Sequence, residues 1–381
     1  MTQSTDPNAK CQHQAVCGGC QILNFDAAQQ TTHHINRLSK EWSEEKLPTL
    51  PQQIQIFGDY AQGSRSVAEF AFRRYDTGTA IGWYHPNHLE LQPLERCPAL
   101  NAPLQPLFRY LAQNPPPINR CRIRIRVSPV EQLGCWIDAA NTDILKLLRE
   151  ADWLKQLMAQ AVVEMGQKHK RVYEASDGLS LRKPQLEPWF QSYGPKGVAL
   201  PLWSTIAGFS QPSIQLNARL IERVLLRIQK STATNWLEFG AGSGNFTLPM
   251  AKLGLTITAT ESSPVARKGL KIGIQALENT ENVQVSHYNL QRNTAESQAL
   301  IEAAQGLLLD PPRSGIGHMK EAFKSAKSTP QTIVYVACAL KGFVKDAQFF
   351  LNQGYALVHI EGVAQFPNTV HCEWIAHFEH Q

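Results

Sequence analysis

Cysteine spacing is the first feature of this sequence that indicates chemistry. Cys11, Cys17 and Cys20 lie within ten residues of one another, and Cys97 stands before a proline far downstream. The first ten residues are polar and hold no apolar signal segment, so we expect these cysteines to be thiols in a cytoplasmic protein. Four clustered thiolates suit either zinc or an iron–sulfur cluster, and spacing alone decides for neither.

A glycine-rich turn is the second candidate site. Residues 238–246 read EFGAGSGNF, and glycines such as Gly240 and Gly242 let a backbone turn tightly and approach a ligand. Glu261 ends the next expected strand, about 20 residues further on, where a carboxylate can accept hydrogen bonds from ribose hydroxyls. Glu238 at the opening of the turn, and the absence of G-x-G-x-x-G spacing, favour S-adenosylmethionine over NAD. A merely tight strand-to-helix turn is the other interpretation.

Three further reactive side chains lie in the last third of the chain, and two of them follow apolar segments. Asp310 comes directly after the apolar run 306–309, and Cys338 follows the run 332–336. The carboxyl ends of parallel strands meet at the sheet edge where such folds place their chemistry. A lone cysteine there is more often a small buried hydrophobe, but beside a nucleotide-type turn it favours a nucleophile. Glu373, which follows a proline-fixed turn, would by itself be assigned to the surface.

The elements that must position these groups fall into two regions. Between about residues 50 and 150, short alternating segments such as Ile54–Phe57 predict an antiparallel sheet. Beyond residue 205, strands alternate with helical stretches, beginning with a helix over Ile214–Lys230, which is typical of a doubly wound parallel sheet. We therefore predict an α/β protein with two domains, residues 1–205 and residues 206–381.

Composition and charge narrow the class of protein. The chain has 381 residues, 43% of them hydrophobic, and holds no apolar run near the roughly 18 residues that a membrane span needs. Its net charge of +5 is concentrated in residues 101–200, which carry 14 basic and 9 acidic groups. There, Arg122, Arg124 and Arg126 alternate with apolar residues, and a row of guanidiniums about 7 Å apart suits a phosphate backbone. A solvated outer sheet face explains the row equally well.

Taken together, these motifs resemble the RNA uracil-C5 methyltransferase family. The resemblance is carried by the cysteine cluster, GFSQ at 208–211, the turn at 238–246, DPPRSG at 310–315, YVAC at 335–338 and FPNTVHCE at 366–373. It implies a C-terminal S-adenosylmethionine domain of Rossmann type behind an N-terminal and central β-rich domain that recognises RNA. It also implies that Cys338 is the nucleophile and Glu373 the base, and that Gln211, Glu261 and Asp310 line the site.

The resemblance extends to the cysteine cluster. Members with C-x5-C-G-G-C and a later cysteine bind a [4Fe-4S] cluster, which implies Cys11, Cys17, Cys20 and Cys97 as ligands. We expect a structural role for such a cluster, because methyl transfer moves no net electrons. Cys121, Cys135 and Cys372 are most simply core or strand residues.

Uracil C5 methylation explains why a cysteine and a carboxylate are needed. C5 is a poor nucleophile until a thiolate adds to C6, and the C5 proton must later leave to a base so that the cysteine can be eliminated. The target base must also be flipped out of any stack. The residues beside Cys338 read Ala337, Ala339 and Leu340 where the family has Ser, Asn and Pro, so a non-catalytic RNA-binding or RNA-folding protein is the alternative.

The likeness also bears on the RNA substrate. Only ten residues precede Cys11, too few for the small RNA-binding barrel that some rRNA enzymes carry there. With the cysteine cluster present, the chain resembles the shorter 23S rRNA enzymes, and we predict 23S rRNA over the T-loop of tRNA. We expect no membrane association and no obligate protein partner.

Overall fold

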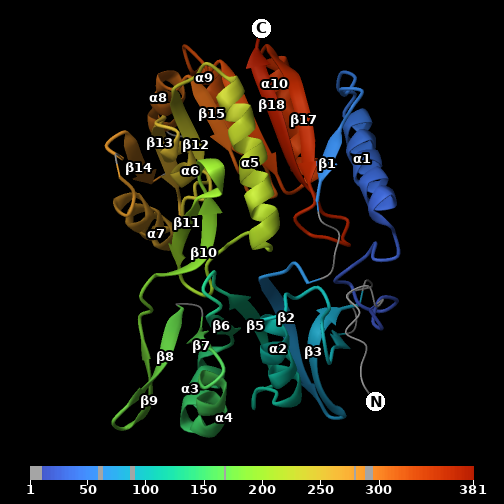
Figure 1. Ribbon diagram of the computed structural model, residues 1–381, viewed down its shortest axis with the longest axis vertical. Coiled ribbons are helices and arrows are strands. Elements are labelled where there is room, and N and C mark those ends of the chain that lie inside the picture. Colours follow the sequence, from blue (N-terminus) through green and yellow to red (C-terminus); the bar gives the residue numbers. More distant parts are fainter. Residues whose placement is uncertain (1–10, 59–62, 86–90, 167–168, 279, 288–294) are drawn as a thin grey trace.

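The computed structural model describes residues 11–58, 63–85, 91–166, 169–278, 280–287 and 295–381. Its helices and strands form two parts, each built on an eight-stranded sheet, and Figure 1 shows one part above the other. No helix in these ranges is both long and apolar enough to cross a membrane.

The upper part in Figure 1 contains the C-terminal sheet, whose spatial order differs from the order along the chain. Neighbouring strands are parallel except for the two pairs made by the last strand. This is the Rossmann-like α/β arrangement that the alternation of strands and helices predicts. In spatial order the strands are β1 (Gln55–Phe57), β17 (Tyr355–Val363), β18 (Glu373–His380), β16 (Thr332–Ala337), β15 (Gly306–Leu309), β12 (Asn235–Phe239), β13 (Thr256–Glu261) and β14 (Val283–His287).

Helices cover both faces of the C-terminal sheet, because successive residues of a buried strand point to opposite sides. Tyr335 of β16 packs with Trp42 in one hydrophobic layer, whereas Val334 and Val336 pack with Leu220 in the other. The helices of this part are α1 (Ala27–Glu44), α5 (Ile214–Lys230), α6 (Thr247–Lys252), α7 (Pro264–Gln275), α8 (Ala295–Ala303), α9 (Met319–Ser325) and α10 (Leu340–Asn352).

The lower part is built on the central sheet, in which all neighbouring strands are antiparallel except one pair, β6 and β7. In spatial order its strands are β4 (Leu91–Pro93), β3 (Gly78–Tyr84), β2 (Val67–Tyr75), β5 (Arg120–Val127), β6 (Leu133–Asp138), β7 (Val162–Met165), β8 (Lys170–Ala175) and β9 (Gly178–Arg182). The helices of the lower part are α2 (Leu104–Gln113), α3 (Asn141–Arg149) and α4 (Ala151–Met158).

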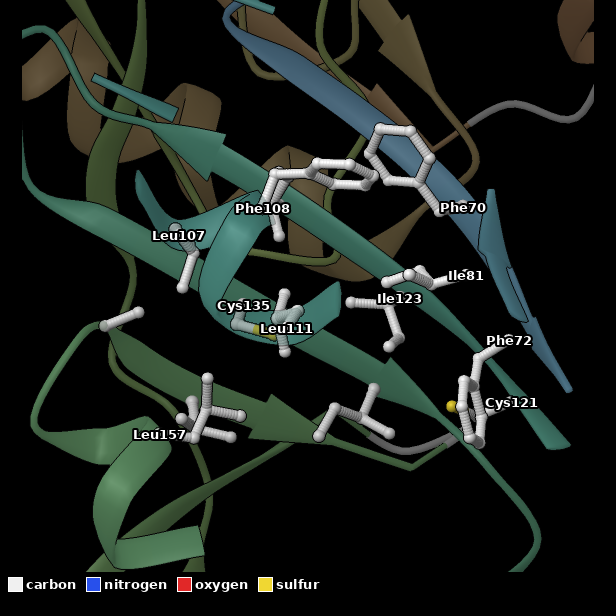
Figure 2. Close-up of a cluster of buried hydrophobic side chains, with 14 of the residues drawn as sticks. Phe70, Phe72, Ile81, Leu107, Phe108, Leu111, Cys121, Ile123, Cys135 and Leu157 are labelled. Carbon is white, nitrogen blue, oxygen red and sulfur yellow. The ribbon is translucent and has the colours of Figure 1, made fainter. Parts of the chain in front are cut away.

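The core of the lower part lies between these helices and the central sheet. Figure 2 shows Phe108 of α2 beside Phe70 of β2, and their ring centroids are 4.5 Å apart. Cys121 and Cys135 are buried in the same cluster. Cys372 is buried in the upper part. The prediction that these three cysteines are core residues is confirmed.

The upper part also contains segments from before the predicted boundary at residue 205. The prediction that Ile54–Phe57 belongs to an antiparallel sheet is wrong, because β1 pairs in parallel with β17. The ribbon of β10 (Glu187–Tyr193) and β11 (Ala199–Ser204), joined by a short 3-10 turn at Pro195–Gly197, places Phe190 and Leu202 in the core of the upper part. The division into residues 1–205 and 206–381 therefore differs from the division between the two sheets.

Candidate active site

One cleft of about 810 Å³ brings together most of the predicted site residues. It opens at the carboxyl ends of β12, β13, β15 and β16, and His169 from the turn between β7 and β8 lines it from the central sheet. The predicted residues that line it are Gln211, Gly240, Gly242, Glu261, Asp310, Cys338 and Glu373. Residues about 160 positions apart thus meet in one place, because β12, β13, β15 and β16 end at the sheet edge where the antiparallel strand β18 begins with Glu373.

The glycine turn is shaped by two neighbouring strand ends. Gly240 has φ +81°, and a Cβ atom there would stand 2.4 Å from the main-chain oxygen of Asp310. Only glycine satisfies both conditions. Gly242 N donates a hydrogen bond of 3.0 Å to Glu261 Oε2, and Ser263 N donates one of 2.6 Å to Glu261 Oε1. These contacts fix the Glu261 carboxylate beside the turn.

Glu238 lies behind the turn and does not line the cleft. Its side chain is buried, and Thr247 Oγ1 donates a hydrogen bond of 2.6 Å to Glu238 Oε2. Glu238 Oε1 has no partner among the described residues, and burial raises the pKa of this carboxyl to about 8. The role of Glu238 as a cofactor ligand stays a prediction.

Cys338 and two carboxyl groups share a poorly solvated site. Burial raises the pKa of Cys338 to about 11, with Glu373 and Asp310 adding to the shift and Arg313 opposing it. Burial and the nearby Asp310 raise the pKa of Glu373 to about 8. Burial and Glu261 likewise raise the pKa of Asp310 to about 7. A bound cation would favour ionisation of all three acids, and the sulfonium of S-adenosylmethionine is such a cation.

Phe209 is a site residue that the motif reading left without a role. Its side chain is 81% exposed and lines the cleft between Gly208 and Ser210. An exposed aromatic ring in a cleft offers a stacking surface to a flat ring such as a nucleobase. The signal in the sequence was the GFSQ segment itself, in which a large apolar residue stands in a polar loop.

The segment that carries Phe209 is held by arginines of β5, which corrects the expected row of phosphate contacts. The Arg126 side chain is buried, and its Nη2 donates hydrogen bonds of 2.7 Å to Gly208 O and 3.0 Å to Ser210 Oγ. Arg124 is paired with Glu69 at 2.8 Å. Of the three arginines only Arg122 has a largely exposed side chain, at 68%. The exposed row is wrong because residues 204–210 pack against this end of β5.

The four clustered cysteines line one cavity, together with the buried Arg65. Arg65 Nη2 donates a hydrogen bond of 3.3 Å to Gly19 O, within the cysteine segment. All four are free thiols, the donor type that iron–sulfur clusters require. Among the residues that the structure describes, however, no group of three or more His, Cys, Asp or Glu side chains is placed to hold a metal ion.

A parallel sheet with a glycine turn after one strand and a carboxylate at the end of the next is the nucleotide-binding arrangement that S-adenosylmethionine-dependent methyltransferases share with other Rossmann-like proteins. Residues 204–380 match the sequence profile of the family described as tRNA (uracil-5-)-methyltransferase. Residues 204–380 thus form a methyltransferase domain of the RNA uracil-C5 methyltransferase family, and the protein is an S-adenosylmethionine-dependent methyltransferase.

Individual relatives match over nearly the whole chain. An uncharacterized RNA methyltransferase of Bdellovibrio bacteriovorus is 28% identical, with 95% of this chain and 93% of the relative covered. A 23S rRNA (uracil(1939)-C(5))-methyltransferase of Pectobacterium carotovorum is 27% identical, with 97% of this chain and 80% of the relative covered. The crystal structure of the Pyrococcus abyssi tRNA (uracil-54, C5)-methyltransferase with S-adenosyl-L-homocysteine shares the fold: its TM-score is 0.66 at 14% identity, covering 95% of this chain and 86% of that one.

Proposed function

We propose that this protein methylates C5 of a uridine in 23S rRNA, with Cys338 as nucleophile and Glu373 as base. The observation that carries the proposal is the meeting of these two side chains with Asp310 and the glycine turn in one cleft. The choice of 23S rRNA is supported by relatives named as 23S rRNA uracil-C5 methyltransferases that match 97% of the chain. The same similarity favours rRNA over tRNA.

The side chains divide the reaction into an addition and an elimination. The Cys338 thiolate forms a bond to C6 of the uracil, and the electron pair of the C5–C6 double bond moves onto the ring as an enolate. C5 then takes up the electrophilic methyl group that S-adenosylmethionine supplies; the sulfur–methyl bond breaks, and its electron pair leaves on the sulfur of S-adenosylhomocysteine. Glu373 removes the C5 proton, the ring double bond re-forms, and the C6–sulfur bond breaks to release Cys338.

The remaining cleft residues would bind and orient the two substrates. Gly240, Gly242 and Glu261 surround the place of the adenosyl group, because backbone amides and a carboxylate suit ribose and methionine polar atoms. Asp310 and Gln211 offer polar groups to the edge of a uracil. RNA recognition would fall to the N-terminal and central part of the chain, and we propose a cytoplasmic location for the reaction.

Two measurements test the reaction. RNA containing 5-fluorouridine should form a covalent complex with the wild-type protein. Its C5 atom carries fluorine in place of the hydrogen that the base would remove as a proton, so elimination stops. Cys338→Ala should form none and should make no 5-methyluridine. A protein that binds the same RNA without forming an adduct would instead be the non-catalytic alternative.

Mass mapping of RNA from a deletion strain tests the substrate. We expect one 5-methyluridine to disappear from 23S rRNA and to return when the wild-type gene is supplied. Return with the Cys338→Ala gene would contradict the nucleophile assignment. Loss of the modification from tRNA alone would overturn the choice of rRNA.

We further propose that Cys11, Cys17, Cys20 and Cys97 bind a [4Fe-4S] cluster with a structural role. The proposal is supported by the four free thiols lining one cavity. Anaerobically purified protein should be brown, with iron and acid-labile sulfide near four of each per chain. A colourless protein loaded with zinc would contradict the proposal.

A further inference from the structure

A pair of buried amides joins helix α1 to the loop that precedes the proposed base. Gln30 Nε2 donates a hydrogen bond of 2.9 Å to Asn368 Oδ1. In return, Asn368 N donates one of 3.1 Å to Gln30 Oε1. Both side chains are buried, so neither bond is exchanged freely for water. The two partners are separated by 338 residues in the chain.

Further hydrogen bonds from the N-terminal arm, residues 11–44, hold the loop at residues 366–372. Ile22 N donates to Asn368 O at 3.1 Å, and Arg37 Nη1 donates to the main-chain oxygen of Val370. Asn368 has φ +65°, a conformation that asparagine adopts more readily than most residues and that tertiary contacts must maintain. The loop therefore takes its shape from residues of the arm as well as from its own sequence.

The loop leads directly into the cleft. Asn368 lies five residues before Glu373, which is the first residue of β18 and lines the cleft with Cys338. Asn368 also lines the cavity of the clustered cysteines. One residue thus touches the cysteine cavity and belongs to the loop that delivers the carboxylate. Cys338, in contrast, follows β16, and neither of the two Gln30–Asn368 bonds involves a residue of that strand.

We propose that Gln30 and Asn368 are positioning residues for Glu373. Through these two residues, the N-terminal arm holds the carboxylate that removes the C5 proton. This inference rests on the proposed function. Loss of the paired amides lets the 366–372 loop relax and displaces the Glu373 carboxylate from C5. Addition of Cys338 to C6 does not need that carboxylate as a base, so this step continues.

The chemistry of the 5-fluorouridine trap separates these two steps. The trap forms when Cys338 adds and the methyl group is transferred, and it needs no proton removal from C5. Turnover on ordinary uridine RNA needs all the steps. A variant in which only Glu373 is displaced therefore retains trapping and loses turnover, whereas a variant that is misfolded loses both.

Gln30→Leu removes both bonds, and Asn368→Gly removes the side-chain acceptor while keeping a residue that tolerates φ +65°. We expect Gln30→Leu to lower kcat on uridine RNA about 10- to 100-fold, as small misplacements of a reacting group do, with KM for RNA unchanged. The rate of 5-fluorouridine trapping should stay within about 2-fold of wild type. Covalent protein–RNA adduct on ordinary uridine RNA should accumulate on denaturing gels.

Two comparisons make the result specific. Asn36→Leu exchanges an amide for leucine on the exposed side of the same helix and should leave kcat unchanged. The double variant Gln30→Leu/Asn368→Gly should be no slower than Gln30→Leu alone, because both changes break the same link. Additive losses in the double variant would contradict the link.

The outcomes for wild type and variant distinguish the two proposals. If the wild-type protein forms no 5-fluorouridine adduct, the proposed function fails and this inference fails with it. If wild type is trapped but Gln30→Leu loses trapping and turnover in equal proportion, the proposed function stands and the positioning role of Gln30 and Asn368 is overturned. Retained trapping with slow turnover supports both.

Discussion

Arg126 Nη2 donates a hydrogen bond of 2.7 Å to the main-chain oxygen of Gly208, across 82 residues of chain. The bond joins β5 of the central sheet to the segment that carries Phe209 and Gln211 into the cleft. Glu164 of β7 also holds this segment, residues 204–211, because its Oε2 accepts a hydrogen bond of 3.1 Å from Ile206 N. The central sheet therefore holds one wall of the candidate active site in place.

Arg126→Lys is expected to loosen this segment without removing the charge. Lysine cannot serve the acceptors that a guanidinium fork reaches together, so the position of Phe209 becomes less defined. Losing one or two charged hydrogen bonds at about 1.5 kcal/mol each predicts a rise of about 10-fold or more in KM for RNA. Steady-state kinetics would measure this, and titration calorimetry should show little change in S-adenosylmethionine affinity.

Arg219→Lys is the matched control for that variant. Arg219 forms an exposed pair with Glu222 on α5, and such surface pairs contribute little. An unchanged RNA KM in Arg126→Lys, or an equal rise in Arg219→Lys, would show that the 204–210 segment does not depend on Arg126.

Activity should rise with pH through the neutral range. The proposed reaction needs the ionised forms of both Cys338 and Glu373, whose pKa values are raised to about 11 and about 8. Because a raised pKa leaves an acid protonated at neutral pH, kcat/KM should increase from pH 6 up to at least pH 8. Arg313 lowers the pKa of Cys338, so Arg313→Gln should move the rise to higher pH. A profile that is flat between pH 6 and 8 would contradict the assignment.

The sequence predicts helices and strands better than it predicts which segments pack over them. The helix at Ile214–Lys230 has the predicted bounds, because periodicity and flanking polar residues define it locally. The common strand edge also predicts that Asp310 and Cys338 meet. Alternation in β5 shows which residues share a face, but not that residues 204–210 would bury Arg126 on it. The Gln30–Asn368 pair has no local signal.

From the raised pKa of Glu238 we expect the free energy of unfolding to fall as the pH rises. Its folded-state pKa of about 8 lies above the ordinary value of 4.5, so between these values the folded protein binds more protons than the unfolded chain. Under that condition the free energy of unfolding decreases with increasing pH. Glu238→Gln keeps an acceptor for Thr247 and removes the ionisation.

Thermal unfolding at two pH values checks this expectation. The Tm of Glu238→Gln relative to wild type should be higher at pH 8 than at pH 5 by at least about 3 °C, since about 1 kcal/mol moves the midpoint by 2–4 °C. A difference between variant and wild type that is the same at both pH values would rule out ionisation of Glu238 as the cause.

Comparing Gly240 with Gly254 separates two effects of an added side chain: the steric clash within the glycine turn, and the general cost of a side chain at positive φ. Alanine at this position must push the turn away from Asp310, because its Cβ would stand 2.4 Å from the Asp310 main-chain oxygen. Gly254 has a similar φ of +78° and nothing within 4 Å of the corresponding position. Both variants should lose about 1 kcal/mol of stability or more from backbone strain. Only Gly240→Ala should also weaken S-adenosylmethionine binding, by about 10-fold or more for a displacement costing 1.4 kcal/mol. Titration calorimetry with the two variants measures the difference directly, and equal dissociation constants would remove Gly240 from the cofactor site.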